Sequence, residues 1–411
     1  MPAWRGHDDK KKAVMTNDTP PKPDTILTHA GSHPDQHQGA VNPPVYRVST
    51  VVFPTVAAMK GGENKPFDTM RYGRTGTPTS FAFEEAVAAL EGGYRSLATC
   101  SGQAAITTAL AAMLQAGDHA LIADSVYHPT RRYCLDHLAR CGIEIEFYDP
   151  LIGAGIAGLI KDNTKVVFTE SPGSLTFEIQ DIPAITAAAH ARGAIVILDN
   201  TWSAGLFFKA LDHGVDISVQ AATKFISGHS DAMLGAITCK TEPLWWKIKN
   251  WMTSAGIAAG SEELYLGLRG LRTLGVRMRQ HQESGLKVAR WLQTRPEVAR
   301  VIHPALPEDP NHAIWKRDFT GAAGLFAVEL KPCPQEAVNA LIDGLKYFGL
   351  GYSWGGFESL ILPTTGAIHR SATHWKPAGP TLRLHIGLED ADDLIADLSR
   401  GLDGLRPAMG I

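Results

Sequence analysis

The sequence predicts an α/β fold in which a mainly parallel central sheet, flanked by helices, is followed by a smaller α/β C-terminal domain. From about residue 96 to residue 221, short apolar segments alternate with amphipathic segments of helical spacing. This alternation is typical of right-handed βαβ units, which build parallel sheets. The chain of 411 residues is also too long for one simple core, because domains usually hold about 100 to 200 residues.

The expected strands are short and apolar, as in a sheet buried on both faces. They are SLATC (96–100), HALIADS (119–125), IEIEFYD (143–149), TKVVFTES (164–171), AIVILDN (194–200) and VDISVQA (215–221). Between them, the spacing of apolar residues predicts helices over GQAAITTALAAMLQAG (102–117), PTRRYCLDHLARCG (129–142) and DIPAITAAAHARG (181–193).

The C-terminal part begins with a long helical pattern over about residues 260–293, of a kind that commonly links two domains. Strand and helix patterns then alternate over GLFAVEL (324–330), QEAVNALIDGL (335–345), SLILP (359–363), LRLHIGL (382–388) and DADDLIADLSRGL (390–402). At the other end, the first 20 or so residues are polar, charged and rich in proline. Such a composition predicts a mobile tail.

The balance of charge argues against several classes of partner. The chain holds 39 basic and 42 acidic residues, so neither a nucleic-acid surface nor a polybasic membrane patch is expected. No apolar run approaches the roughly 20 residues that span a bilayer, and the N-terminus lacks the apolar stretch of a signal peptide. We therefore expect a cytoplasmic protein that acts on a small molecule.

The cysteines and histidines do not indicate a metal site. The five cysteines are odd in number and widely scattered, and the 16 histidines are dispersed as well. Neither set shows CxxC, zinc-ligand or HExxH-like spacing. Reduced, mostly structural thiols and no bound metal are therefore expected.

Lys224 stands just after a strand-like segment, within DISVQAATKFISGHSD (216–231). Apolar residues alternate with small or polar ones up to Ala221, and the chain then turns through Ser227 and Gly228. Lys224 therefore leaves a strand end for a cleft. A solvated surface lysine is the ordinary alternative, because lysines are mostly exposed, so the neighbouring residues must decide between the two.

Asp199 ends the apolar strand AIVIL, 25 positions before Lys224. In a parallel sheet both residues lie at the carboxyl edge, where ligands bind. Alone, the aspartate is as well explained as the cap of a turn through Asn200 and Thr201. Together with Lys224, it points to pyridoxal 5'-phosphate (PLP). This cofactor needs a lysine that binds it as a Schiff base and an acidic partner that keeps its ring nitrogen protonated.

A helix N-terminus suited to a phosphate lies at CSGQAAITTAL (100–110). Free backbone N–H groups and a positive partial charge make such a terminus an anion site. An ordinary glycine turn capped by Ser101 is the alternative. Thr223, beside the lysine, offers a hydroxyl to the same phosphate. Tyr127, in a loop after another strand, is placed to lie over the ring, although packing alone explains many loop tyrosines.

A competing motif is GAGIAG (153–158), which matches GxGxxG, follows a strand and has Glu170 further along the chain. This pattern mimics the dinucleotide fingerprint of an NAD-dependent dehydrogenase. However, Pro150 stands before the glycines, and the turn residues 162–164 leave only a very short helix after Gly158. Nicotinamide binding is therefore the weaker alternative.

The sequence resembles the PLP-dependent enzymes of cysteine and methionine metabolism, of fold type I. DISVQAATKFISGHS follows the lysine signature of that family throughout its length, and RYGRTGTPT, SGQAA, LDNTWSAG and TLRLHIGLED correspond in order across residues 70–390. The resemblance implies three parts. Residues 1–74 form an N-terminal tail and an arm that contributes to the neighbouring subunit, residues 75–268 form the PLP-binding domain, and residues 269–411 form the C-terminal domain.

The resemblance also assigns cofactor-binding roles. It implies that Lys224 carries PLP as a Schiff base, that Asp199 pairs with the ring nitrogen, and that Tyr127 stacks on the ring. Lys224 and Tyr127 then belong to the catalytic set. The phosphate is expected to contact Gly102, Gln103 and Thr223.

The remaining roles concern the subunit interface and the substrate. By resemblance, Tyr72, also in the catalytic set, and Arg74 reach the phosphate bound by a neighbouring subunit. This implies a homo-oligomer with shared sites, by family habit a homotetramer. Arg383 is expected to clamp the α-carboxylate of an amino-acid substrate. Ser353 and Trp354 line the same pocket.

Within the family, SWGGFESLI (353–361) and ESPGSLTFEIQDIP (170–183) are similar to the bacterial cystathionine β-lyase branch. The γ-synthases and γ-lyases usually carry leucine where Trp354 stands. The implied activity is β-elimination of L-cystathionine to L-homocysteine, pyruvate and ammonia, with other L-cysteine S-conjugates as further substrates. The alternatives are a cystathionine γ-synthase, a methionine γ-lyase, a catalytically silent PLP-binding regulator and, outside the family, the dehydrogenase.

Two positions depart from the family pattern. Many members carry a serine phosphate ligand three places before the lysine, where this chain has Ala221. The asparagine common in the ETPANP-like loop is replaced by Ser174. The groups that contact the phosphate and the ring oxygen are therefore left open.

Overall fold

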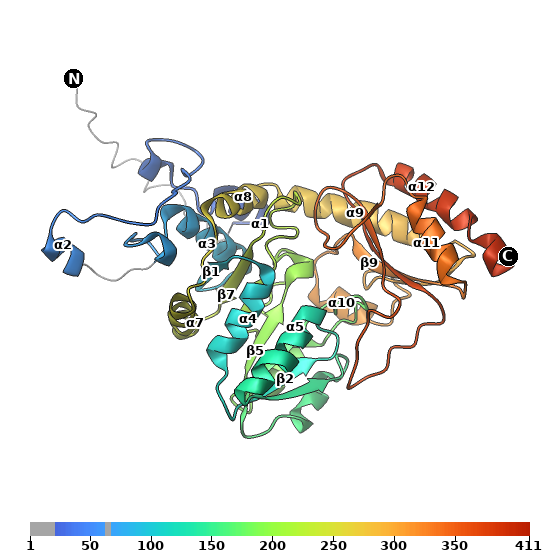
Figure 1. The fold of residues 1–411 in the computed structure, drawn as a ribbon, viewed down its shortest axis with the longest axis horizontal. Helices are drawn as coiled ribbons and strands as arrows, with labels where there is room; N and C mark the ends of the chain where they lie inside the picture. Colours follow the sequence, from blue (N-terminus) through green and yellow to red (C-terminus); the bar gives the residue numbers. More distant parts are fainter. Residues whose placement is uncertain (1–20, 62–66) are drawn as a thin grey trace.

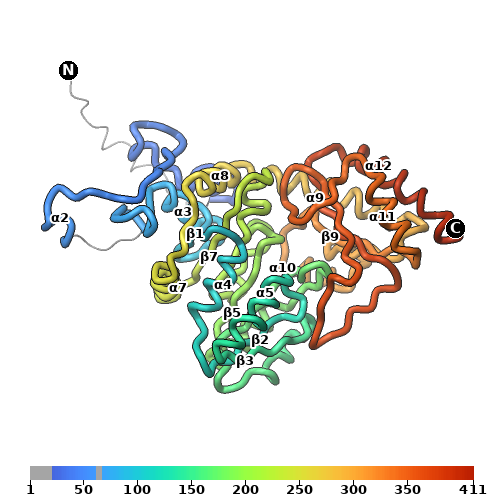
Figure 2. Tube along the Cα trace, in the orientation of Figure 1, coloured from blue at the N-terminus to red at the C-terminus, as the bar shows by residue number. Residues whose placement is uncertain are grey.

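The computed structural model describes residues 21–61 and 67–411, arranged around a large sheet and a smaller one (Figure 1). The tail predicted for the first 20 residues lies outside the described residues. Figure 2 shows the N-terminal segment and the C-terminal unit on opposite sides of the large sheet. The N-terminal segment contains the short helices α1 (Pro23–His29) and α2 (Val56–Lys60).

The large sheet has seven strands in the order β1-β7-β6-β5-β4-β2-β3. Only β7 runs against the others, since it pairs antiparallel with both β1 and β6. The mainly parallel sheet is therefore confirmed, whereas β7 was not predicted. The strands are β1 (Arg95–Thr99), β2 (His119–Ala123), β3 (Glu144–Tyr148), β4 (Thr164–Glu170), β5 (Ile195–Asp199), β6 (Ile217–Gln220) and β7 (Gly235–Cys239).

Three of the helices around this sheet begin at side-chain caps. Thr77 and Ser80 form a capping box at the start of α3, and the side chains of Ser101 and Asp181 cap α4 and α6. Among the described residues, no helix combines the length and apolar character needed to cross a membrane. The helices are α3 (Pro78–Glu91), α4 (Gly102–Met113), α5 (His128–Tyr133), α6 (Ile182–His190), α7 (Glu242–Ala255), α8 (Ser261–Leu271) and α9 (Leu274–Gln293).

The single long helix expected over residues 260–293 is wrong, because the structure divides it into α8 and α9. The break falls at Arg272 and Thr273, and Thr273 has φ −111° and ψ 6°. Arg272 donates two hydrogen bonds of 2.8 Å to backbone carbonyls in and just after α1. These tertiary contacts fix a turn that helical periodicity does not reveal, since the apolar spacing continues across it.

The smaller sheet has five strands in the order β10-β11-β12-β9-β8. The strand and helix patterns expected after residue 320 are confirmed. The strands are β8 (Val298–Ile302), β9 (Leu325–Leu330), β10 (Gly349–Leu350), β11 (Leu360–Pro363) and β12 (Thr381–His385), and the helices are α10 (His312–Asp318), α11 (Gln335–Asp343), α12 (Ala391–Asp403) and α13 (Arg406–Met409).

Helix α9 links the two sheets by contributing to both apolar cores. Leu274 and Met278 pack into the cluster around the large sheet, and Val288 and Leu292 pack into the cluster around the smaller one. This placement agrees with the linking role expected from the sequence. The domain boundaries at residues 74 and 268 stay predictions.

Candidate active site

A cavity of ≈ 510 Å³ opens at the carboxyl edge of the large sheet, where α/β sheets bind their ligands. The ends of β2, β4, β5 and β6 all contribute to its lining. The structure brings nine of the eleven predicted site residues to this cavity, namely Gly102, Gln103, Tyr127, Asp199, Thr223, Lys224, Ser353, Trp354 and Arg383.

Lys224 lies in the turn after β6, which several hydrogen bonds hold in place. The Lys224 N–H donates to the Ala221 carbonyl at 2.9 Å, and the Gly228 N–H donates to the Lys224 carbonyl at 2.8 Å. Arg277, on α9, donates to the Phe225 carbonyl at 2.6 Å. Gly228 has φ +71°, and a Cβ there would lie 2.0 Å from Arg277 Nη1, so the turn requires glycine at this position.

The Lys224 amine faces the cavity beside the loop that carries Ser353 and Trp354. Its Nζ donates to Ser353 Oγ at 2.5 Å and lies 5.4 Å from the Trp354 ring centroid. Burial lowers the pKa of Lys224 to about 8, with a further contribution from Arg383 and an opposing one from Asp199. The amine is therefore partly neutral near neutral pH, and a neutral amine can attack a carbonyl carbon or accept a proton.

Asp199 ends β5 with a buried and only partly compensated carboxylate. Its Oδ1 accepts hydrogen bonds from the Thr201 N–H at 3.1 Å and from the Thr201 hydroxyl at 2.5 Å. Burial raises the pKa of Asp199, while Thr201 and Lys224 act in the opposite direction. A cationic N–H group beside this carboxylate would stabilise its charged form. The protonated ring nitrogen of PLP is such a group, so this position fits the cofactor.

Glu170 is a site residue that sequence reasoning assigned only to the dinucleotide alternative. It ends β4 directly opposite Asp199 in the parallel register, and its Oε2 accepts the Tyr127 N–H at 2.7 Å. Burial, together with the charge of Asp199, raises the pKa of Glu170 well above its usual value. Glu170 is therefore the more readily protonated member of the pair, and Asp199 is the more readily ionised one. The sequence signal that could have identified Glu170 as a site residue is its position at the end of a central strand.

The N-terminus of α4 fits a phosphate. Ser101 Oγ caps the helix by accepting the Ala104 N–H at 3.0 Å. Within the described part of the chain, the N–H groups of Gly102 and Gln103 have no acceptor. A Cβ on Gly102 would lie 2.4 Å from the Ala221 Cβ, so only glycine lets the helix approach the lysine turn this closely.

Thr223 also lines the cavity, but its hydroxyl is already hydrogen-bonded to the backbone of Leu234. It accepts the Leu234 N–H at 2.8 Å and donates to the Leu234 carbonyl at 3.1 Å. These two bonds tie the lysine turn to the segment that leads into β7. The contact of Thr223 with the phosphate stays a prediction.

Tyr127 precedes α5 and borders the cavity with 46% of its surface exposed. Burial of its phenol raises the pKa of Tyr127, and the nearby Glu170 and Asp199 add to this effect. The phenol therefore stays protonated near neutral pH. Its exposed ring is available to cover a planar ligand, as predicted for the face of PLP.

Arg383, on β12, supplies a buried positive charge from the smaller sheet. Its Nη2 donates to the Ser353 carbonyl at 2.8 Å, and its Nε has no partner among the described residues. Burial lowers the pKa of Arg383 to about 10, so the guanidinium remains charged at neutral pH. Ser353 has φ +76°, which is uncommon for a residue with a side chain. The bonds from Arg383 and Lys224 hold Ser353 in this conformation.

The structure does not bring Tyr72 and Arg74 to the cavity of their own chain. Tyr72 precedes the 3₁₀ helix η2 (Gly73–Thr75) and has 45% of its surface exposed. Arg74 donates from Nη1 to the Thr253 carbonyl at 2.6 Å. Their predicted contact with PLP therefore requires a second subunit.

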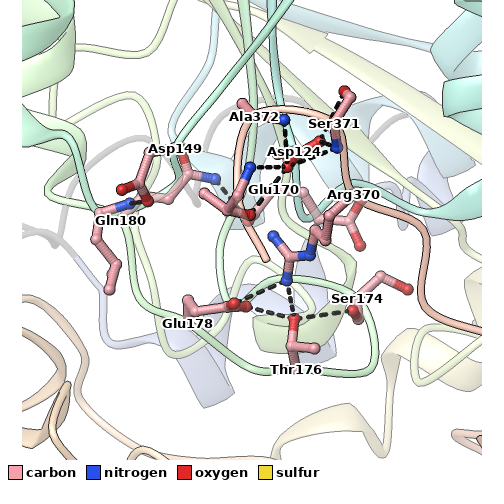
Figure 3. Close-up of polar contacts among 12 residues, drawn as sticks. Asp124, Asp149, Glu170, Ser174, Thr176, Glu178, Gln180, Arg370, Ser371 and Ala372 are labelled. Atoms are coloured by element: carbon pink, nitrogen blue, oxygen red, sulfur yellow. Dashed lines mark hydrogen bonds and ion pairs between the residues drawn. The ribbon is translucent and has the colours of Figure 1, made fainter. Parts of the chain in front are cut away.

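A segment of the C-terminal part that sequence reasoning missed also borders the cavity. Residues 366–375, called the strap below, cross to the end of β2 (Figure 3). Asp124 accepts the backbone N–H groups of Ser371, Ala372 and Thr373 at 2.8 to 3.1 Å. Although burial acts to raise it, these bonds hold the pKa of Asp124 below its usual value. Asp124 therefore fastens the strap as an ionised acceptor.

The GAGIAG segment does not form a dinucleotide site. It folds as the 3₁₀ helix η5 (Gly153–Gly158), and β4 begins soon after it at Thr164. A dinucleotide fingerprint needs the glycines to open an α-helix whose N-terminus faces the pyrophosphate. The short 3₁₀ turn provides no such helix. The motif on which the dehydrogenase alternative rested therefore does not form a dinucleotide site.

Comparison with known proteins identifies the family. The profile of the family described as Cys/Met metabolism PLP-dependent enzyme matches residues 24–403. The chain belongs to this family. It is 49% identical over 381 residues to a putative cystathionine beta-lyase of Rhizobium johnstonii, and the match covers 92% of this chain and 95% of the relative. It is 46% identical to cystathionine beta-lyase MetC of Escherichia coli, with coverage of 92% and 98%.

A solved structure shows the same fold. Cystathionine gamma synthase from Xanthomonas oryzae pv. oryzae, in complex with aminoacrylate and cysteine, has a TM-score of 0.87 and 32% sequence identity. The match covers 95% of this chain and all of that one. The fold type I architecture and the use of PLP, both expected from the sequence, are confirmed by the family and by this similarity.

Proposed function

We propose that this protein catalyses the PLP-dependent β-elimination of L-cystathionine, with water, to L-homocysteine, pyruvate and ammonia, in the cytoplasm and as a homotetramer. The observation that carries the proposal is the arrangement of Lys224, Asp199 and Arg383 around one cavity. Several relatives that match more than nine-tenths of the chain are named cystathionine beta-lyases. Other L-cysteine S-conjugates share the reacting atoms and are expected as further substrates.

The residues of the chain have distinct tasks in this reaction. When PLP is bound, it supplies an electron sink. This sink takes up the electrons that remain on the substrate Cα after the Cα proton is removed. Lys224 Nζ accepts that proton and returns one to the departing sulfur, a role that a pKa of about 8 suits. Arg383 binds the α-carboxylate and so orients the Cα–H bond toward the amine. Asp199 keeps the ring nitrogen protonated.

The direct test is the identity of the keto acid released from L-cystathionine. The purified protein is supplied with PLP and L-cystathionine, and the products are analysed by mass spectrometry. Pyruvate with homocysteine supports the proposal. 2-Oxobutyrate with cysteine would make the protein a γ-lyase, and the absence of any keto acid would favour a γ-synthase or a regulator.

We expect Trp354 to favour β- over γ-elimination by restricting the space beside Lys224. The Trp354 ring packs 5.4 Å from the Phe225 ring and 5.4 Å from Lys224 Nζ. Gamma chemistry needs a second proton removal, at Cβ, and room for the side chain to rotate. Trp354→Leu should therefore lower the pyruvate yield by about tenfold and release 2-oxobutyrate. An unchanged product ratio, equal to that of the remote variant Trp246→Leu, would contradict this role.

We expect the active site to be shared between subunits, because Tyr72 and Arg74 lie outside the cavity of their own chain. Lys224→Ala and Tyr72→Phe proteins should each be nearly inactive. The two variants are mixed, unfolded and refolded together, so that about half of the dimers contain one chain of each variant. Each mixed dimer has one intact site of two, so about a quarter of the wild-type activity should return. Activity that stays at the level of the separate variants would show that each chain completes its own site.

A further inference from the structure

Two buried arginines line the cavity, and each has an N–H group without a partner in the described part of the chain. Arg383 leaves Nε unpaired, and Arg370 leaves Nη1 unpaired. Only 5% of the Arg370 side chain is exposed. Leaving a buried donor unsatisfied costs folding free energy, and a charged donor costs more than a neutral one. A ligand group in the cavity that these residues line would satisfy such an orphan donor.

The Arg370 guanidinium is fixed on one edge. Its Nη2 donates to Glu178 Oε1 at 2.7 Å and to Thr176 Oγ1 at 2.6 Å (Figure 3). The backbone next to it is fastened by the bonds from Ser371 to Asp124. Because the guanidinium is a planar fork, engagement of one edge leaves the Nη1 edge for a second acceptor.

A second orphan group lies near this arginine. Ser125 Oγ is buried, lines the cavity and has no hydrogen-bond partner among the described residues. A Cβ on Gly173 would lie 2.7 Å from Ser125 Oγ and 3.0 Å from Glu178 Oε2. The Ser125 hydroxyl and the carboxylate that holds Arg370 therefore lie against the same side of one glycine, which places a neutral donor beside the ion pair of Arg370.

We propose that Arg370 Nη1, with the Ser125 hydroxyl beside it, binds the distal carboxylate of the thioether substrate, while Arg383 binds the α-carboxylate at the reacting end. This inference rests on the proposed function, because it takes the substrate to be an amino acid with a second carboxylate on the departing thiol. Two buried cationic donors in one cavity match the two carboxylates of such a substrate. A substrate without the distal carboxylate leaves Nη1 unpaired and is disfavoured.

The test compares L-cystathionine with S-ethyl-L-cysteine, a thioether that lacks the distal carboxylate. The measured quantity is the ratio of kcat/KM for the two substrates. Arg370→Gln should lower this ratio on the order of 10- to 100-fold, the effect of losing one charge-assisted hydrogen bond, and Arg370→Lys should restore part of it. An unchanged ratio, whether both rates fall together or neither falls, would overturn the proposal.

Glu178→Gln separates ligand binding from a purely structural role of the strap. It removes the charge of the carboxylate that holds Arg370 but keeps an oxygen that can accept the hydrogen bond from Arg370 Nη2, so the ratio should change less than about threefold. A fall as large as that of Arg370→Gln would mean that only the position of the strap matters. Arg192 is an exposed arginine. The variant Arg192→Gln is the control for the general loss of a positive charge, and it should leave both rates unchanged.

A binding measurement keeps this inference distinct from the proposed reaction. In PLP-loaded Lys224→Ala protein, calorimetry gives dissociation constants for both thioethers without turnover. When Arg370→Gln is combined with Lys224→Ala in one protein, the dissociation constant of L-cystathionine should rise by the same 10- to 100-fold. The dissociation constant of S-ethyl-L-cysteine should stay within about threefold of its value in the Lys224→Ala protein. If the wild-type protein forms no keto acid from either thioether, the proposed reaction fails, and these dissociation constants still decide the role of Arg370.

Discussion

Replacing Lys224 with alanine should lower the turnover of L-cystathionine by at least about 10⁴-fold, because the amine acts both as base and as acid. Lys224 is the one lysine that lines the cavity within the described residues, so no other amine can take its place. The turn around it is held by backbone bonds from Gly228 and by Arg277, not by the lysine side chain. The variant should therefore fold, which circular dichroism and the thermal midpoint can check.

The lowered pKa of Lys224 gives this prediction a pH dependence. Only the neutral amine attacks the PLP aldehyde. Covalent uptake of PLP by the cofactor-free protein should therefore speed up with rising pH and level off above about pH 8. Stopped-flow absorbance measures the rate, and borohydride reduction followed by peptide mapping locates the attachment. Lys240→Ala, which removes an exposed lysine after β7, should behave as wild type. A rate that keeps rising toward pH 10.5, the ordinary lysine pKa, would contradict the proposed environment.

The parallel part of the fold could be predicted because its signals are local. Each buried strand is a short apolar run, and Ser101 and Asp181 mark helix starts that the structure confirms. Strand β7 was missed because nothing local distinguishes its apolar run, and it becomes a strand by pairing with β1, about 140 residues away. The break after α8 was missed for a similar reason. Arg272 ends that helix through contacts with a segment about 240 residues earlier.

The residues of the candidate site also fall into those with a local sequence signal and those without one. Lys224, Asp199 and the start of α4 follow strands directly, so the rule that ligands bind at the carboxyl edge was enough to place them together. Arg370 carries no such signal, since it lies in a segment without regular structure and reaches the cavity through contacts with Glu178 and, by way of its neighbours, with Asp124. Tyr72 and Arg74 could be assigned only by resemblance, because their predicted partner is another chain.

Replacing Asp199 with asparagine should lower kcat by about 10²- to 10⁴-fold, since removal of one member of a buried ion pair costs about 3–5 kcal/mol. Asparagine keeps the shape of the side chain and an oxygen that can accept the two Thr201 hydrogen bonds. Its amide, however, offers N–H groups to a ring nitrogen that needs an acceptor. Asparagine would therefore not hold a proton on that nitrogen, and the electron sink that PLP would supply would be weaker. Measurement of kcat at saturating PLP separates this effect from weaker cofactor binding.

Glu170→Gln is the matched control for Asp199→Asn, because the two carboxyl groups stand opposite each other at the same edge of the sheet. Burial and the charge of Asp199 raise the pKa of Glu170 further than burial raises the pKa of Asp199, so glutamine changes the charge less at this position and should lower kcat by less than about tenfold. Equal losses in the two variants would mean that both carboxylates share the charge facing the ring. An Asp199→Asn protein with wild-type kcat would reduce Asp199 to the cap of the turn at Thr201, and the PLP ring nitrogen would then need a different partner.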